Sequence, residues 1–290
     1  MTKFDLADLS NAVAEIAGQA ASLTASFSTH HGRTATAFHW DEGLYVTAEE
    51  ALEPDEELQL ALSSGESVKT ELVGRDPSTG IALLKPSATA VATSFKKAGP
   101  VRLGDVVVAT GREGASPLAV LGTVSEFGPM WRSRRGGTID RRINLAVMAG
   151  ARFEGGAVLD ARGGLVGMLL FGPRGRALVI PYETIERTVA TLRDKGHVLR
   201  GYLGAGLHPI REGQVQGAMV MGLDDEGPAK AAGIVLGDIV TAWDGEPVRG
   251  PRDLILRLGS DSAGTAVTLT VLRGEEKRDV VVTVGEKPLV

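Results

Sequence analysis

Few residues of this 290-residue chain are of types that could do covalent chemistry. The absence of cysteine excludes thiolate nucleophiles, disulfides and thiolate metal sites. The histidines are His30, His31, His39, His197 and His208. They form no His-x-x-x-His pair and no cluster with carboxylates, and the chain has no Gly-x-Ser-x-Gly elbow. The sequence therefore predicts no metal site and no cofactor, and it carries no local motif of a nucleophilic enzyme.

The charge and the hydropathy of the chain limit which partners and which cellular compartment can be expected. A net charge of −5 argues against nucleic acid, because proteins neutralise phosphates with a basic surface. The basic run Arg132–Arg142 is interpreted first as a solvated loop and second as an anion-binding or partner-binding patch. No stretch is long and apolar enough to span a bilayer. Charged residues near the start do not fit a secretory signal, so the sequence predicts a cytoplasmic protein, or a periplasmic one if a leader has been removed.

The spacing of apolar residues predicts a mainly β chain of three parts. Residues 1–20 carry apolar side chains at every third or fourth position, which predicts an N-terminal amphipathic helix. Residues 21–198 give short apolar runs bounded by Gly, Pro, Asp and Ser, the pattern of antiparallel strands in a sandwich or barrel. Their number suits two six-stranded barrels, closed by a helix that ends at Gly196. Residues 199–290 alternate strands with two short helical patches and predict an α+β module.

The C-terminal module resembles the PDZ domains of HtrA proteases. The matching segments are Gly-Pro-Ala-Lys-Ala-Ala-Gly-Ile at 227–234, Leu-Gly-Asp-Ile-Val at 236–240 and Trp-Asp-Gly-Glu-Pro-Val at 243–248. Their order and spacing follow the family without a gap. The resemblance implies a helix, a turn, a buried strand and a tight Asp-Gly turn.

A PDZ domain adds an incoming C-terminal strand to a sheet edge, while the amides of a short loop hold its carboxylate. The loop that matches consists of Tyr202, Leu203, Gly204 and Ala205. Glycine suits this loop because the backbone must turn its amides toward an anion. The resemblance places the opposite wall on the helix that follows Arg252, with Leu254 and Leu258 either lining the groove or packing in the core.

The N-terminal part resembles the HtrA protease domain, which has a chymotrypsin-like double β-barrel. The matching segments, in order, are Gly74–Lys85, Leu103–Gly111, Gly122–Ser125, Gly155-Gly156, Gly163–Met168 and Val179–Pro181. The strand at Leu103–Gly111 leads to the place of the family's Asn-Pro-x-Gly loop. So many matches in the right order predict that the scaffold is kept over nearly the whole region.

The residues at the family's catalytic positions differ from the family pattern. Glu50 stands where the family has histidine, Gly80 where it has the orienting aspartate, and Glu154 where it has the serine nucleophile. A serine protease needs a hydroxyl, an imidazole and a carboxylate at these places. Arg152 stands at the glycine of the oxyanion turn, so the preorganised amides of that turn are expected to be lost as well.

Glu50 and Glu154 leave three interpretations open. The preferred one is that both carboxylates point to water in a decayed site. The pair could also bind a cation, or do acid–base work of the kind that glycosidases perform.

Together these features predict a catalytically inactive HtrA-like protein, not an enzyme, that binds peptide C-termini or unfolded segments through its PDZ domain. The alternative is a serine endopeptidase of protein quality control, and a third possibility is a scaffold with an inert PDZ domain. The family implies a bacterial protein that assembles as a homotrimer, or as a mixed oligomer with an active relative. The N-terminal helix would then serve assembly or pack on its own barrel.

Overall fold

The computed structural model describes residues 5–29, 32–52, 58–88, 93–198, 200–212, 215–259 and 262–286. The chain forms two compact units, each described here by itself. The first comprises Met1–Trp131 and Thr138–His197, and the second comprises Arg132–Gly137 and Val198–Val290. No helix in the described ranges is long and apolar enough to cross a membrane.

The first unit holds two closed six-stranded barrels, which confirms the predicted fold class. The first barrel has the order β1-β2-β3-β6-β5-β4 and consists of β1 (Thr24–Ser28), β2 (Thr34–His39), β3 (Tyr45–Ala48), β4 (Gln59–Ala61), β5 (Ser67–Asp76) and β6 (Ile81–Pro86). The second has the order β11-β14-β13-β12-β7-β8 and consists of β7 (Val106–Glu113), β8 (Ser116–Gly128), β11 (Arg142–Ala146), β12 (Ala157–Asp160), β13 (Leu165–Phe171) and β14 (Ala177–Pro181). A short β9–β10 pair (Trp131–Arg132 and Thr138–Ile139) follows β8. Each barrel encloses its own cluster of buried hydrophobic side chains.

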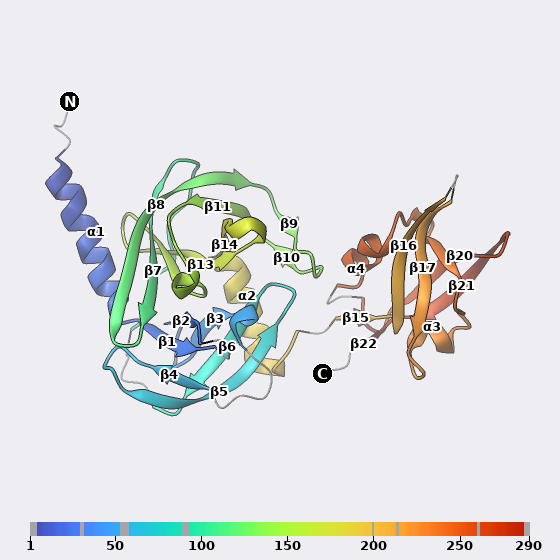
Figure 1. Cartoon of the computed structure of the whole chain (residues 1–290), viewed down its shortest axis with the longest axis horizontal. Coiled ribbons are helices and arrows are strands. Elements are labelled where there is room, and N and C mark those ends of the chain that lie inside the picture. The colour runs from blue at the N-terminus through green and yellow to red at the C-terminus, as the bar shows by residue number, and fades with distance from the viewer. Residues whose placement is uncertain are drawn as a thin grey trace. The chain divides into compact units, whose positions relative to one another are not determined.

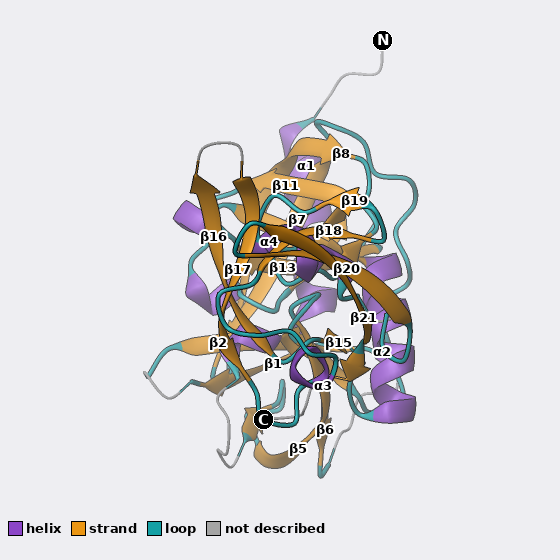
Figure 2. Cartoon of the chain, turned by 90° about the vertical axis from the view of Figure 1, so that its right-hand side faces the viewer, coloured by secondary structure: helices purple, strands orange, loops and turns teal. Residues whose placement is uncertain are grey.

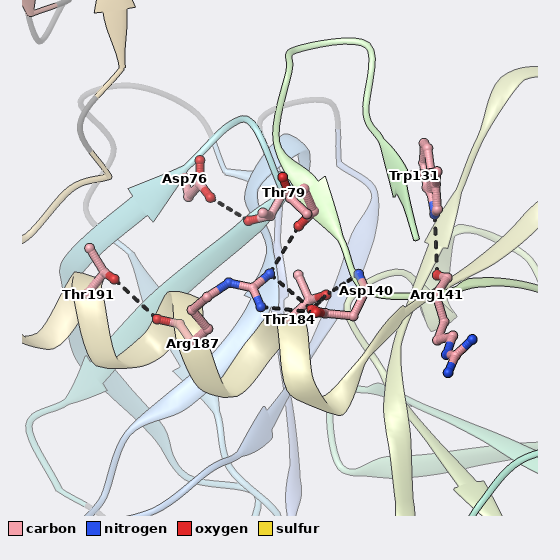
Figure 3. A network of polar contacts seen from close by, with 9 residues as sticks. Asp76, Thr79, Trp131, Asp140, Arg141, Thr184, Arg187 and Thr191 are labelled. Atoms are coloured by element: carbon pink, nitrogen blue, oxygen red, sulfur yellow. Dashed lines mark hydrogen bonds and ion pairs between the residues drawn. The ribbon is translucent and has the colours of Figure 1, made fainter. Parts of the chain in front are cut away.

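Two helices accompany the barrels (Figure 1). Helix α1 (Leu6–Ala21) begins at Asp5, whose carboxylate accepts from the Ala7 amide at 2.8 Å, and packs against β7 and β8. Helix α2 (Tyr182–Lys195) ends at Gly196, which is left-handed at φ 74°, as the sequence predicts. Asp140 anchors α2 by accepting from the Thr184 hydroxyl at 2.6 Å and from Arg187 (Figure 3).

The second unit is the predicted α+β module. Its main sheet runs in the order β16-β17-β18-β20-β21, with β16 (Ala205–Glu212), β17 (Val215–Leu223), β18 (Ile239–Trp243), β20 (Ala266–Arg273) and β21 (Glu276–Thr283). Strand β16 lies at one edge of this sheet, beside β17 (Figure 2). The smaller elements are β15 (Gly201–Tyr202), α3 (Pro228–Ala231), β19 (Glu246–Pro247), α4 (Pro251–Arg257) and β22 (Gly285–Glu286).

A buried ion pair fixes the turn before β18. The Asp238 side chain is fully buried, and both of its oxygens accept from Arg273 at 2.8 Å. Burial alone would raise the pKa of Asp238, but the bonds from Arg273 and from the Val235 amide outweigh it and lower that pKa. The Leu-Gly-Asp motif thus contributes a buried charge that is paired within the fold.

Candidate functional site

The loop before β12 carries the residues that match the nucleophile motif. A short 3₁₀ turn (Ala151–Phe153) leads to Glu154 and then to Gly155 and Gly156. Gly155 has φ 79°, and a Cβ on it would lie 2.3 Å from the Thr36 carbonyl oxygen. A Cβ on Gly156 would lie 1.9 Å from the Thr110 carbonyl oxygen. Both positions therefore require glycine, because the loop is pressed directly onto neighbouring backbone.

Three consecutive amides of this loop, those of Phe153, Glu154 and Gly155, are paired within the protein. Phe153 donates to the Gly150 carbonyl at 2.9 Å, and Glu154 donates to the Ala151 carbonyl at 2.9 Å. The amide of Gly155 donates to the Leu169 carbonyl at 2.9 Å. The guanidinium of Arg152 pairs with Glu113 at 2.6 Å, on the exposed side of the turn. These amides are thus already satisfied when no ligand is present.

The positions predicted from the triad are brought together. Gly80 ends the turn between β5 and β6, and its carbonyl accepts from the Glu49 amide, one residue before Glu50. A Cβ on Gly80 would meet Leu170 of β13 at 3.0 Å. The half-buried Glu154 lies close enough to the exposed Glu50 for their charges to interact. Burial is the main cause that raises the pKa of Glu154, the Glu50 charge adds to it, and Arg33 opposes it.

Two buried acids near this site escaped the sequence reasoning. Asp76 lies four residues before Gly80, and its carboxylate accepts from the amide and the hydroxyl of Ser78. It also accepts from the Thr79 hydroxyl (Figure 3). Glu49 is buried and paired with Arg75, whose Nε lies 2.9 Å from its carboxylate. The Asp-Pro-x-Thr pattern could have pointed to the first, since Asp and Thr at that spacing form local turns.

The histidines fall at different places. His39 is buried at the end of β2, where burial lowers its pKa, and its ring lies 5.3 Å from that of Tyr45. His197 follows α2, and His208 lies on β16. His30 and His31 lie outside the described residues. Within the described ranges, no three His, Asp or Glu side chains are arranged to hold a metal ion.

The second candidate site is the loop between β15 and β16. Gly204 is left-handed at φ 68°, and a Cβ on it would lie 2.7 Å from the Gly227 Cα. The carbonyls of Leu203 and Gly204 accept from the amides of Ala229 and Asp224, at 2.8 and 2.9 Å. The amides of Leu203 and Gly204 have no hydrogen-bond partner among the residues that the structure describes. This turn therefore uses its acceptors and leaves two donors unpaired.

Comparison with known proteins matches both units. The model of the trypsin-like peptidase domain matches residues 35–168, and that of the PDZ domain matches residues 201–284. Two solved structures named "HtrA-type protease AlgW", one with a decapeptide and one with a tripeptide, superpose with TM-scores of 0.70 and 0.66 at 23% and 25% identity. They cover 97% and 96% of this chain, which covers 99% and 98% of theirs. The chain thus has a trypsin-like domain followed by a PDZ domain, and its fold is that of the HtrA-type structures.

Curated relatives agree with this assignment. A "Probable periplasmic serine endoprotease DegP-like" of Brucella suis is 31% identical over 267 residues, which is 86% of this chain and 51% of the relative. A protein of the same name from Rhizobium meliloti is 29% identical over 269 residues, 87% of this chain and 53% of the relative. The chain thus spans about half the length of the curated relatives it matches.

These names overturn one prediction made from the sequence. We expected that the chain is not an enzyme, but the relatives are named serine endoproteases and the similar structures are named proteases. That prediction is wrong. It relied on the residue types at positions 50, 80 and 154. Those residue types do not by themselves decide whether the chain is an enzyme.

The two leucines predicted for the peptide site, at helix α4 of the PDZ domain, differ in their burial. Leu254 is fully buried in the domain core, so it supports the wall from behind and is not open to a ligand. Leu258, the residue that follows α4, is half-buried and packs against the same core. Helix α4 packs against β16, the strand that follows the loop with the unpaired amides.

Proposed function

We propose that this chain binds the C-terminal ends of peptides or of unfolded protein segments through its PDZ domain. The observation that supports this most directly is that the amides of Leu203 and Gly204 have no partner in the described part of the chain. Unpaired backbone donors in a left-handed turn form a concave site for an anion, and a terminal carboxylate fits it. The four residues predicted for this role are Tyr202, Leu203, Gly204 and Ala205.

The strand that follows the loop suits an added peptide. Strand β16 is at the edge of its sheet, so an extended peptide can pair with it, except that Pro209 has no N–H to donate. An extended peptide would pair with β16, alongside α4, with its carboxylate at the loop. Leu258 offers an apolar contact near that end. The neighbouring structures that are named with a decapeptide and with a tripeptide are consistent with a peptide ligand.

Fluorescence anisotropy with a library of labelled C-terminal peptides tests this function on the full chain. We expect micromolar binders whose affinity falls at least tenfold when the terminal carboxylate is replaced by an amide, because the loop then loses a charged acceptor. The amidated peptide is a matched control, since it keeps every side chain. Equal affinity of the two forms would contradict the proposal, and so would a library without binders.

Hydrolysis of peptide bonds is the second candidate function, and the names of the relatives support it. A hydroxyl nucleophile is absent at position 154 and an imidazole is absent at position 50, where both side chains are carboxylates. We infer that any cleavage by this chain uses these carboxylates and not a serine. Casein cleavage should then resist a fluorophosphonate probe and fall in the Glu154→Gln variant. Cleavage that the probe abolishes would contradict this inference.

Compartment and assembly complete the proposal. The relatives are named periplasmic, and this favours the periplasmic alternative over the cytoplasmic prediction. We further propose a homotrimer, or a mixed oligomer with an active relative, as the family resemblance implies. Light scattering of the purified chain, alone and mixed with such a relative, measures the mass of the assembly and tests both proposed oligomers.

A further inference from the structure

The hydroxyl and the amide of Thr36, in β2, both donate hydrogen bonds to the loop that carries Glu154. Its hydroxyl donates to the Arg152 carbonyl at 2.7 Å, and its amide donates to the Glu154 carbonyl at 2.9 Å. Its own carbonyl accepts from the Thr47 hydroxyl at 2.7 Å. Thr36 is completely buried, so these bonds face no competition from bulk water. The position of the 3₁₀ turn therefore depends on a residue 116 positions away in the sequence.

The hydroxyl of Thr36 is in turn oriented by Arg112. The Arg112 amide donates to this hydroxyl at 2.9 Å, so the hydroxyl hydrogen is directed to the Arg152 carbonyl. Arg112 lies in β7. It belongs neither to the carboxylate pair nor to the PDZ groove.

The side chain of Arg112 connects this arrangement to helix α1. The residue is only 2% exposed, and among the described residues no carboxylate forms an ion pair with it. Its guanidinium donates to the carbonyl of Ala21, the last residue of α1, and to that of Ala115 at 3.0 Å. Its Nε donates to the Thr24 hydroxyl at 3.3 Å. A cation is favoured at this end of a helix, because the last carbonyls carry partial negative charge.

A simpler explanation is that Arg112 only fastens α1 to the barrel. That explanation accounts for the guanidinium contacts but not for the bonds that run through the Arg112 amide and Thr36 to the loop. The neighbouring Glu113–Arg152 ion pair is exposed on both sides, at 51% and 53%, and therefore contributes little. The buried route is the stronger connection between α1 and the loop.

We propose that Arg112 and Thr36 are positioning residues that couple the docking of α1 to the conformation of residues 150–156. When α1 is docked, Arg112 is held by the Ala21 carbonyl, and the Thr36 hydroxyl holds the 3₁₀ turn in the paired form described above. When α1 leaves, β7 loses that anchor and the turn is freed. Any partner or second copy that captures α1 would thereby change the loop that carries Glu154.

Hydrogen exchange measured by mass spectrometry on the full chain tests this coupling. Deletion of residues 1–21 should speed exchange of the amides of Phe153, Glu154 and Gly155 at least tenfold. Thr36→Val removes only the hydroxyl and should produce a similar increase. By reciprocity of coupling, it should also speed exchange at the C-terminal end of α1. Thr47→Val is the matched control, because it removes a buried threonine hydroxyl next to Thr36 but outside the route to Arg112.

The outcomes separate coupling from general loosening. Hydrogen exchange in β13 and the midpoint of thermal unfolding report on the stability of the barrel. Exchange in the loop should increase by more than exchange in β13 does. Arg112→Lys keeps the charge and should restore part of the protection that Arg112→Met loses. If the deletion leaves loop exchange within twofold of the full chain, or if Thr47→Val acts on the end of α1 as strongly as Thr36→Val, the proposal fails. The proposal would also fail if hydrogen exchange in the loop rose by no more than exchange in β13.

Discussion

Two glycine-containing turns of this chain differ in how many of their backbone amides are paired. In residues 150–155 the amides of Phe153, Glu154 and Gly155 all donate to carbonyls of the protein. In the PDZ loop the amides of Leu203 and Gly204 have no partner among the described residues, while the carbonyls are occupied. The first turn also carries Glu154, whose pKa is raised by burial and by the charge of Glu50. The same surroundings disfavour an added anion. Both turns contain glycine, so the pairing of their amides, and not their glycine content, is what distinguishes the turn proposed to bind a carboxylate.

The largest effect is expected when the buried charge of the PDZ domain loses its partner. Arg273→Met leaves Asp238 buried without its guanidinium, at a cost of about 3–5 kcal/mol. Peptide binding should disappear with the fold of this domain. Urea unfolding measures the loss, and Arg278→Met, which breaks an exposed pair with Glu276, is the control that should change stability by less than about 1 kcal/mol.

Alanine at the two close-packed glycines tests how rigidly each turn is held. Gly156→Ala places a methyl group 1.9 Å from a backbone oxygen and should destabilise the protease domain by about 3 kcal/mol. Gly204→Ala places one 2.7 Å from the Gly227 Cα, in a left-handed residue, and should cost about 2 kcal/mol while it abolishes peptide binding.

Gly233→Ala separates the backbone cost of the Gly204 substitution from its contact cost. Gly233 has φ 87° but open space around its Cβ position, so only the left-handed penalty of about 1 kcal/mol applies. This variant should keep its peptide affinity. Thermal unfolding and anisotropy together decide the matter, and an equal loss of binding in both variants would show that the contact with Gly227 is unimportant.

The fold was predictable because its signals are local. The segment Gly227–Ile234 and the Leu-Gly-Asp motif match their family in sequence order, and each forms the element expected of it. The contacts that set the two turns were not predictable in the same way. Arg112 and Thr36 are 76 positions apart, and nothing near either residue indicates the other. The family resemblance pointed to Leu254 and Leu258 as candidates for the peptide groove, but it could not say how deeply each is buried.

The charge of Glu154 predicts how stability depends on pH. Its pKa is raised in the folded state by burial and by Glu50, so folding favours the protonated acid. The stability that this preference provides is complete below the usual value near 4.5 and is lost as the pH rises through the raised pKa. Glu154→Gln should therefore stabilise the chain by about 0.5–1 kcal/mol at pH 7 and by nothing at pH 4. Denaturant unfolding across this range checks the trend, and a constant difference would contradict it.

The smallest effect is expected at the exposed pair of Arg152 and Glu113. A double-mutant cycle with Arg152→Ala and Glu113→Ala should give a coupling of about 0.5 kcal/mol, reduced further by salt. A coupling above about 2 kcal/mol would show that this pair, and not Thr36, holds the turn.

The contrast between the two turns is tested most directly by amide NMR of the full chain during titration with a peptide that ends in a free carboxylate. The account predicts that the amide signals of Leu203 and Gly204 move strongly with the free acid and little with the amidated peptide, while those of Phe153 and Glu154 stay in place. Shifts centred on Phe153 and Glu154, or equal responses of the PDZ loop to both peptides, would contradict it.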